Sequence, residues 1–310
     1  MKKIIFIILL CLLITSSVAL AGSDVTLQEI TAKNSLEPQI ERGQPNCLID
    51  SAGSIASIPQ KVILLNPNID SHIVNSKTEQ YLRDFIRDNT ETMRGVKVRI
   101  NQCSPIQELD RLVKNKHVSL IWRIFPGIPV TIWSSLTGRI LGGDNYNPYT
   151  NTISLYSNDP AVALHEACHA KDFMSRPTGL ETDAYAVGRI FSPVALYQEF
   201  TASDEAIAYL KKKGDSKAEV DSYSTLYPAF GTYGGAYTGL PYGNIMGACV
   251  GHGVGFWKRY EHRLCSGNIR FGEVCNNLES DQLAGKLLKS ERQNDESLSK
   301  ALKSTQISWR

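Results

Sequence analysis

The spacing of apolar residues in the first half of the chain predicts a strand, a helix and a second strand. Residues 62–65 form a short apolar run that is typical of a buried strand. After Ser76, which has Glu79 three residues further on as in a capping box, apolar residues recur at helical spacing. Residues 96–100 then alternate as a strand does, and a second helix is expected over residues 105–115.

The next segments lead to the part of the chain that carries candidate chemistry. Residues 118–136 are apolar but contain an arginine, two prolines and a glycine, so we expect two short core segments rather than a membrane span. Residues 150–156 alternate and predict a strand with one buried face. Asp159 followed by Pro160 is an N-cap with proline in the first helical position, so a helix is expected to begin there.

A charge-free stretch with regularly spaced glycines follows over residues 222–257. Glycine occupies every fourth position from Gly231 to Gly255, which places the missing side chains along one stripe of a helix. Pro241 divides the run, so a helical hairpin is expected. This glycine zipper predicts close helix packing, and three uses stay open: membrane association, a homo-oligomer formed through the glycines, or a hairpin packed within the domain.

Composition and cysteine usage suggest an exported globular protein. The 42% hydrophobic and 21% charged residues are ordinary for a folded domain, and a dispersed net charge of +2 argues against nucleic acid as a partner. Two lysines, an apolar run and Ala19-Leu20-Ala21 predict a signal peptide over residues 1–21, hence a periplasmic or secreted protein. Six cysteines remain, and we expect disulfides, first between Cys265 and Cys275 and second between Cys47 and Cys103.

One short motif carries the candidate chemistry. His165 and His169 are four residues apart in the helix expected after Asp159, so their side chains lie on one face of it. Zinc at a catalytic site takes three protein ligands and leaves one position open for water. Glu166, beside the first histidine, can take a proton from that water as a general base. The spacing therefore predicts a zinc-dependent hydrolase.

This motif resembles the His-Glu-x-x-His signature of the zincin metallopeptidases. The resemblance implies Zn²⁺ as cofactor, a peptide or protein substrate, and an edge strand directly before the active-site helix. In the gluzincin subgroup a glutamate on a later helix is the third ligand, which Glu199 matches best, and Ser203 or Asp204 would orient a zinc-bound histidine. In the aspzincin subgroup the third ligand is an aspartate, for which Asp183 is the candidate.

The resemblance leaves open which residue stabilises the oxyanion and what role Cys168 has. Tyr185, Tyr197 and His252 are candidates for stabilising the oxyanion in the transition state. Cys168 lies about 100° round the helix from His169, so we expect it to be buried, or paired with Cys249, rather than to bind zinc.

Together these patterns predict an α+β chain in five parts. They are a signal peptide (1–21), a loosely structured lead-in segment (22–58), a zincin-like domain with a small mixed sheet (59–221), a glycine-zipper hairpin (222–258), and a cysteine loop with a C-terminal helix (259–310). The expected function is that of a zinc metallopeptidase. The alternative is a membrane-associated scaffold or pore-like protein, in which the glycine zipper is the functional element and the zinc site is structural or vestigial.

Overall fold

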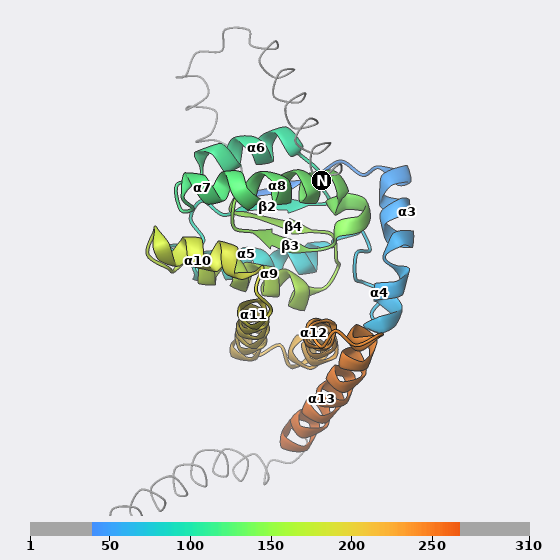
Figure 1. Cartoon of the computed structure of the whole chain (residues 1–310). Helices are drawn as coiled ribbons and strands as arrows, with labels where there is room; N and C mark the ends of the chain where they lie inside the picture. The colour runs from blue at the N-terminus through green and yellow to red at the C-terminus, as the bar shows by residue number, and fades with distance from the viewer. Residues whose placement is uncertain (1–38, 267–310) are drawn as a thin grey trace, which may run out of the picture. The chain divides into compact units, whose positions relative to one another are not determined.

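The computed structural model of the protein describes residues 39–266 (Figure 1). The chain divides into two compact units, Met1–Glu41 and Arg42–Arg310, and the description below concerns the second. Strand β1 (Ile40–Arg42) crosses the boundary between them. The predicted signal peptide, the predicted C-terminal helix beyond residue 266, and the pairing of Cys265 with Cys275 lie outside the described residues.

The centre of the larger unit is a small mixed sheet. Strand β4 (Thr152–Leu155) pairs in parallel with β2 (Lys97–Ile100), with Val98 opposite Ile153, and antiparallel with β3 (Asn145–Asn147). The predicted edge position of the strand before the active-site helix is therefore wrong: β4 is central, and β3 lies at an edge of the sheet. Being central, β4 is buried along almost its whole length instead of on one face only.

Helices cover both faces of this sheet (Figure 1). On one face lie α6 (Pro105–Lys114), α7 (Leu120–Trp122), η1 (Arg123–Gly127) and α8 (Ile128–Thr137), which η2 (Gly138–Gly142) follows. On the other lie α5 (Ser76–Asp88) and α9 (Pro160–Met174), which pack against each other. The mixed sheet with its helical layers confirms the predicted α+β class.

Two sequence predictions for the first part of the chain are wrong. Residues 62–65 are not a strand, because Val62 lies in helix α4 (Ile58–Ile63) and Leu65 follows it in a turn with φ of 50°. Both side chains are exposed, whereas Leu64 between them is buried, so the run places one side chain in the core and is not a buried strand. The predicted lead-in contains a regular helix, α3 (Cys47–Ala56), whose N-cap Asn46 accepts a hydrogen bond from the backbone N–H of Ile49 at 3.1 Å.

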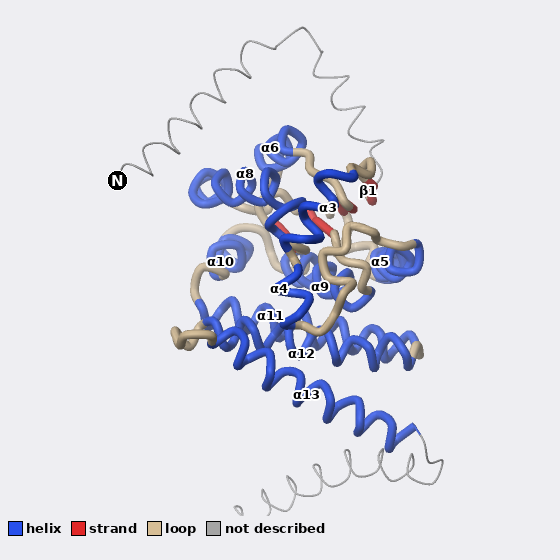
Figure 2. Tube along the Cα trace, turned by 90° about the vertical axis from the view of Figure 1, so that its right-hand side faces the viewer, coloured by secondary structure: helices blue, strands red, loops and turns tan. Residues whose placement is uncertain are grey.

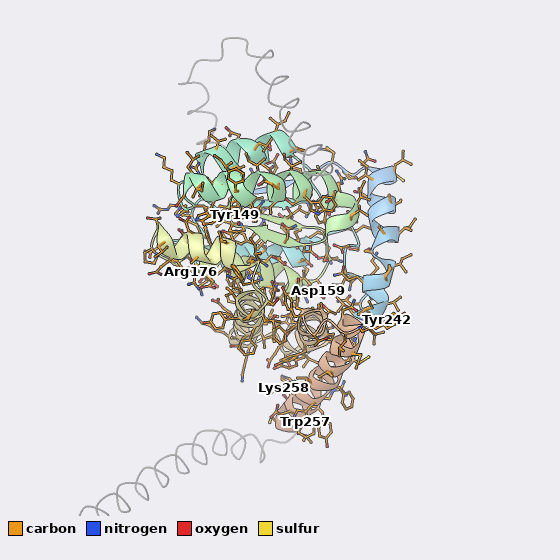
Figure 3. The ribbon with its side chains drawn as sticks, viewed as in Figure 1. Tyr149, Asp159, Arg176, Tyr242, Trp257 and Lys258 are labelled. Carbon is orange, nitrogen blue, oxygen red and sulfur yellow. The ribbon has the colours of Figure 1, made fainter. Side chains whose placement is uncertain are left out.

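Helix α9 begins where the sequence predicts. Asp159 is its N-cap and accepts a hydrogen bond from the backbone N–H of Ala161 at 2.8 Å. The same carboxylate accepts a hydrogen bond from Thr225 Oγ1 at 2.9 Å and from Asn66 Nδ2 at 2.7 Å (Figure 3). One capping residue thus ties the start of α9 to helix α12 (Ser216–Ala236). The helices α10 (Leu180–Gly188) and α11 (Ser192–Lys213) complete this layer.

The glycine-rich segment forms a helical hairpin of α12 and α13 (Gly243–Ser266), which lie side by side (Figure 2). A Cβ atom on Gly247 would lie 1.9 Å from the carbonyl oxygen of Gly231, and one on Gly235 would lie 1.9 Å from that of Gly243. The glycines thus allow direct backbone contact between the helices. No element begins at residue 222: α12 starts at Ser216 and also packs on α9 and α11, so the hairpin continues the larger unit.

Cys47 and Cys103 are both free, so the predicted disulfide between them is not formed. Cys168 is buried and also unpaired.

Within residues 39–266, no helix combines the length and the hydropathy that crossing a bilayer requires. The last turns of α13 nevertheless carry exposed aromatic residues, among them Trp257 beside Lys258 (Figure 3).

Candidate metal centre

Two histidines of α9 and one glutamate of α11 converge in the interior of the protein. His165 and His169 lie one turn apart, with their Nε2 atoms 3.1 Å from each other. The Glu199 carboxylate lies against both rings, with Oε2 3.1 Å from Nε2 of His165 and Oε1 3.4 Å from Nε2 of His169. All three side chains are nearly buried, which makes the convergence a property of the packed core.

The spacing of these atoms fits a tetrahedral metal ion. Zinc binds nitrogen and oxygen ligands at about 2.0–2.2 Å, so two ligands of a tetrahedral site are separated by about 3.3 Å. The separation of the two Nε2 atoms, 3.1 Å, agrees with that value, and each Nε2 lies at a similar distance, 3.1 or 3.4 Å, from a different oxygen of the Glu199 carboxylate. Among residues 39–266, these are the only three His, Cys, Asp or Glu side chains that form such a group. The residues therefore fit a metal ion with three protein ligands.

The outer nitrogen of each imidazole has a hydroxyl partner. Nδ1 of His165 lies 3.2 Å from the Oγ atom of Ser203, and Nδ1 of His169 lies 3.4 Å from the hydroxyl of Tyr185. If each Nδ1 carries the proton and donates it to the hydroxyl oxygen, each Nε2 keeps its lone pair directed at the centre. Ser203 and Tyr185 thus orient the candidate ligands, and Ser203 rather than Asp204 contacts the histidine.

Glu199 is held as a carboxylate by the positive groups around it. Burial favours its neutral form, but the positive charges of His169 and His165 outweigh burial and hold its pKa well below the usual range. Nη2 of Arg189 donates a hydrogen bond to Oε1 of Glu199 at 2.8 Å. Arg189 lies between α10 and α11, and no sequence motif points to it. Its guanidinium binds the same carboxylate oxygen that lies 3.4 Å from Nε2 of His169.

The two imidazoles titrate differently although they are adjacent. Burial alone would lower the pKa of His165, but its hydrogen bond with Glu199 outweighs burial and raises the pKa above its ordinary value. Burial, with the Arg189 charge adding, lowers the pKa of His169 to about 4. A pair of nitrogen atoms 3.1 Å apart can share one proton but not hold two. The site therefore favours a single positive charge between the rings.

Glu166 is a buried carboxyl group beside the first histidine. Burial raises the pKa of Glu166 to about 7, and the negative charges of Glu199 and Asp144 add to that shift, while the His165 charge opposes it. A carboxyl group with a pKa near neutrality can both accept and return a proton at neutral pH. The structure thus gives Glu166 the acid–base property that the sequence motif requires of it.

Tyr233 of α12 is a second residue that the sequence analysis missed. The negative charge of Glu199, followed by burial and the charge of Glu166, raises the pKa of Tyr233 well above its ordinary value. Tyr233 is 43% exposed, whereas Tyr197 is 63% exposed and Nε2 of His252 donates to the carbonyl oxygen of Ile63 at 2.9 Å. Tyr233 lies among the regularly spaced glycines, and no sequence pattern there points to a polar role.

The remaining candidates lie outside the group. Asp183 accepts hydrogen bonds from the backbone N–H of Ser119 at 2.7 Å and from the Ser119 hydroxyl, so its carboxylate fixes the start of α7 instead of joining the histidines. Cys168 is fully buried, and burial raises the pKa of its thiol well above the usual value. A thiol that stays protonated is a poor metal ligand.

Comparisons with known proteins add no relative. Neither the models of protein families, nor the curated proteins, nor the solved structures include one that matches this chain. The functional argument therefore rests on the geometry of this centre.

Proposed function

We propose that the protein is a zinc-dependent hydrolase that cleaves peptide bonds, with His165, His169 and Glu199 as zinc ligands. The observation that carries the proposal is the convergence of two imidazole nitrogens, 3.1 Å apart, with one buried carboxylate that has an oxygen within 3.4 Å of each of them. A set of two imidazoles and one carboxylate suits zinc, since calcium and magnesium prefer oxygen ligands only. Three protein ligands leave one position for water or substrate, as in catalytic zinc sites.

Each residue has a role that its position supports. Zinc bound here would act as a Lewis acid that polarises a carbonyl group and makes water more acidic. Glu166 takes a proton from the attacking water and returns it to the amine that leaves. Ser203 and Tyr185 keep the imidazoles in one orientation and tautomer. Tyr233 of α12, on whose hydroxyl the charges of both glutamates act, would donate a hydrogen bond to the developing oxyanion.

The alternative, a glycine-zipper scaffold or pore-like protein, has weaker support. Six of the seven glycines of the zipper pack against backbone atoms of the same hairpin, and the seventh, Gly239, lies in its turn. The glycine stripe is therefore used within the chain and is not free to contact a second copy. The buried acid, the histidines and their hydroxyl partners have no role in such a scaffold, so the hydrolase explains more of the structure.

Metal analysis together with a hydrolysis assay tests the proposal. Purified mature protein should contain about one zinc per chain and should cleave a mixed set of fluorescent peptides. A chelator should abolish cleavage, and added zinc should restore it. His169→Ala should lose both zinc and activity, because one of three ligands is removed. Full zinc content in that variant, or activity that survives the chelator, would contradict the proposal.

A further inference from the structure

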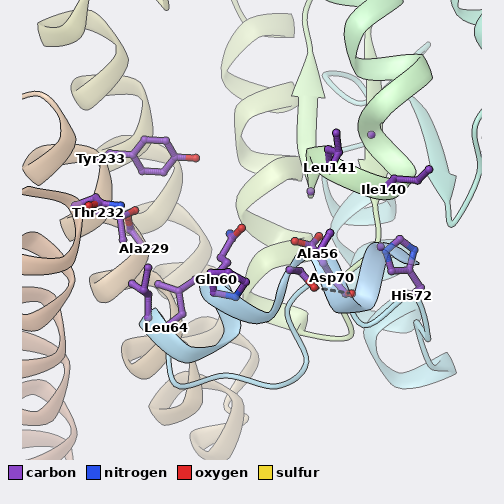
Figure 4. Close-up of a pocket in the computed structure, with 17 residues that line it drawn as sticks. Ala56, Gln60, Leu64, Asp70, His72, Ile140, Leu141, Ala229, Thr232 and Tyr233 are labelled. Carbon is purple, nitrogen blue, oxygen red and sulfur yellow. Dashed lines mark hydrogen bonds between the residues drawn. The ribbon is translucent and has the colours of Figure 1, made fainter. Parts of the chain in front are cut away.

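A cavity of about 490 Å³ lies between α12, the helices α3 and α4, and the loop that carries Asp70 (Figure 4). Tyr233 and Thr232 of α12 form one wall, the helices α3 and α4 form a second, and the segments around Asp70 and around residues 138–143 close the far end. Several of its lining residues are apolar, including Ala56, Leu64 and Leu141. A cavity of this size holds a side chain or a small organic group.

One carboxylate at the far end of this cavity is buried without a hydrogen-bond partner. Asp70 is only 6% exposed, and its Oδ1 atom makes no hydrogen bond. Its backbone N–H donates to Oγ of Ser157 at 2.8 Å, and the backbone N–H of His72 donates to the carbonyl oxygen of Tyr156 at 2.9 Å, so this loop is held firmly in place. A buried carboxylate oxygen without a partner is costly unless a ligand satisfies it.

The charges around Asp70 leave it available to a cation. The negative charge of Asp144 acts on Asp70 and adds to its affinity for positive charge. The positive charge of Lys61 opposes this effect, but its ammonium group donates to the carbonyl oxygen and the hydroxyl of Ser54, at 2.9 and 2.8 Å. Lys61 therefore acts on Asp70 through space and does not fill the hydrogen-bonding position at Oδ1.

We propose that this cavity binds the side chain of a lysine or arginine residue of the substrate, whose cationic end pairs with Asp70. The inference rests on the proposed function and names its substrate class, peptides with a basic residue near the cleaved bond. Lysine and arginine side chains join an apolar stem to a charged end, which matches apolar walls that lead to a buried carboxylate. A metal ion fits less well, because calcium needs six or more oxygen ligands and no third acid joins Asp70 and Asp144 within residues 39–266.

The cavity adjoins the elements that carry the reacting groups. Tyr233 lines it from α12, the helix that packs on both α9 and α11. At the other end, Asp144 accepts a hydrogen bond from the backbone N–H of Ser157, just before α9, and the backbone N–H of Asp70 donates to Oγ of Ser157. A side chain that fills the cavity would therefore lie beside the helix that carries Glu166, as a specificity pocket for a residue near the cleaved bond requires.

Matched peptides test this pocket in the zinc-loaded protein. The peptides differ at one position only, which carries lysine, arginine, norleucine or glutamate. This varied position is moved in turn along both sides of a single cleaved bond. Norleucine has a comparable apolar stem without the charge. We expect kcat/KM for lysine or arginine to exceed that for norleucine about 10- to 100-fold at one position, because a hydrogen bond to a charged group is lost with norleucine. Asp70→Asn should bring that ratio close to one, whereas Asp221→Asn on the exposed face of α12 should leave it unchanged.

Two further measurements keep the test decisive. If Asp70→Asn unfolds, Ala56→Phe narrows the cavity and should lower cleavage of the lysine peptide relative to a matched alanine peptide. Calorimetry with N-acetyl-arginine amide measures the pocket without hydrolysis, and its affinity should fall at least tenfold in Asp70→Asn. Cleavage without a basic preference overturns the pocket and leaves the proposed function intact. If no peptide is cleaved but the amide binds in an Asp70-dependent way, the hydrolase proposal fails and the cation site stands.

Discussion

The hydroxyl oxygen of Ser203 lies 3.2 Å from Nδ1 of His165, on the side of the ring that faces away from the candidate metal position. Ser203 and Glu199 are four residues apart on α11, so one face of this helix supplies both a candidate ligand and the group that orients another. The charged neighbour Asp204 lies a further 100° round the helix and lines an apolar groove between α11 and the hairpin. The hydroxyl, and not the acid, therefore determines the tautomer of His165.

Ser203→Ala should weaken zinc affinity about 10- to 100-fold, because an unsupported imidazole loses its preferred tautomer and orientation. Competition with a fluorescent chelator measures the change. Asp204→Asn is the matched control and should leave the affinity within about twofold. If Asp204→Asn weakened zinc affinity and Ser203→Ala did not, Asp204 would be the residue that orients His165.

Glu199→Ala should release zinc under chelator competition that wild type withstands, because only two ligands remain. Asp183→Ala should keep its zinc, since that carboxylate bonds to Ser119. Its expected effect is a loss of stability, measured by thermal unfolding. Retention of zinc by Glu199→Ala together with its release by Asp183→Ala would support the aspzincin-like assignment in place of the gluzincin-like one.

Glu166→Gln should keep a full complement of zinc and lower kcat about 100- to 10,000-fold, because the change removes a base and no ligand. Metal analysis and peptide hydrolysis on the same preparation check both halves of this expectation. Glu181→Gln on the exposed side of α10 is the control for the loss of one negative charge and should behave as wild type. Undiminished activity in Glu166→Gln would mean that this carboxyl group is not the base.

Asp70 should make the stability of the protein depend on pH. Burial and the charge of Asp144 raise the pKa of Asp70 to about 7, from 3.8 in an unfolded chain. The folded state therefore holds a proton that the unfolded state releases, so the contribution is complete below about pH 4 and is lost as pH rises through 7. Relative to Asp70→Asn, wild type should lose up to about 4 kcal/mol of unfolding free energy over this range. Urea unfolding at pH 4, 6 and 8 measures the difference, and a constant difference would rule out the shift.

Two glycines of α13 should respond oppositely to the same substitution. Gly247→Ala places a methyl group 1.9 Å from the carbonyl oxygen of Gly231, so the helices must separate and the protein should lose about 1–3 kcal/mol. Gly253 faces open space, and Gly253→Ala should be neutral or stabilise by up to about 1 kcal/mol through helix propensity. Thermal or urea unfolding of the pair separates packing from propensity. Equal effects at both positions would mean that the stripe does not hold the hairpin together.

Local patterns predicted those elements whose residues carry their own signals. The start of α9 could be predicted because Asp159 caps its own helix and Pro160 fixes the first turn. Helix α6 could be predicted from its apolar spacing. The run 62–65 was wrongly predicted to be a strand, because a short apolar segment has the same pattern in a buried strand and at the end of a helix such as α4. The glycine spacing predicted close helix packing, but only the antiparallel contact of Gly231 with Gly247 decided that the partner is in the same chain.

By itself, the sequence determined the positions of His165, Glu166 and His169 on one helix, since a spacing of four residues places two side chains on one face wherever that helix lies. It left open whether Glu199 or Asp183 joins them, because that choice depends on how α11 packs against α9 and not on any local pattern. Only the tertiary structure decided for Glu199 over Asp183 and for Ser203 over Asp204, and added Arg189 and Tyr233. It also placed Asp70 in a cavity that Tyr233 lines. These residues come from segments far apart in the chain, and the burial that shifts their pKa values exists only once the helices have packed together.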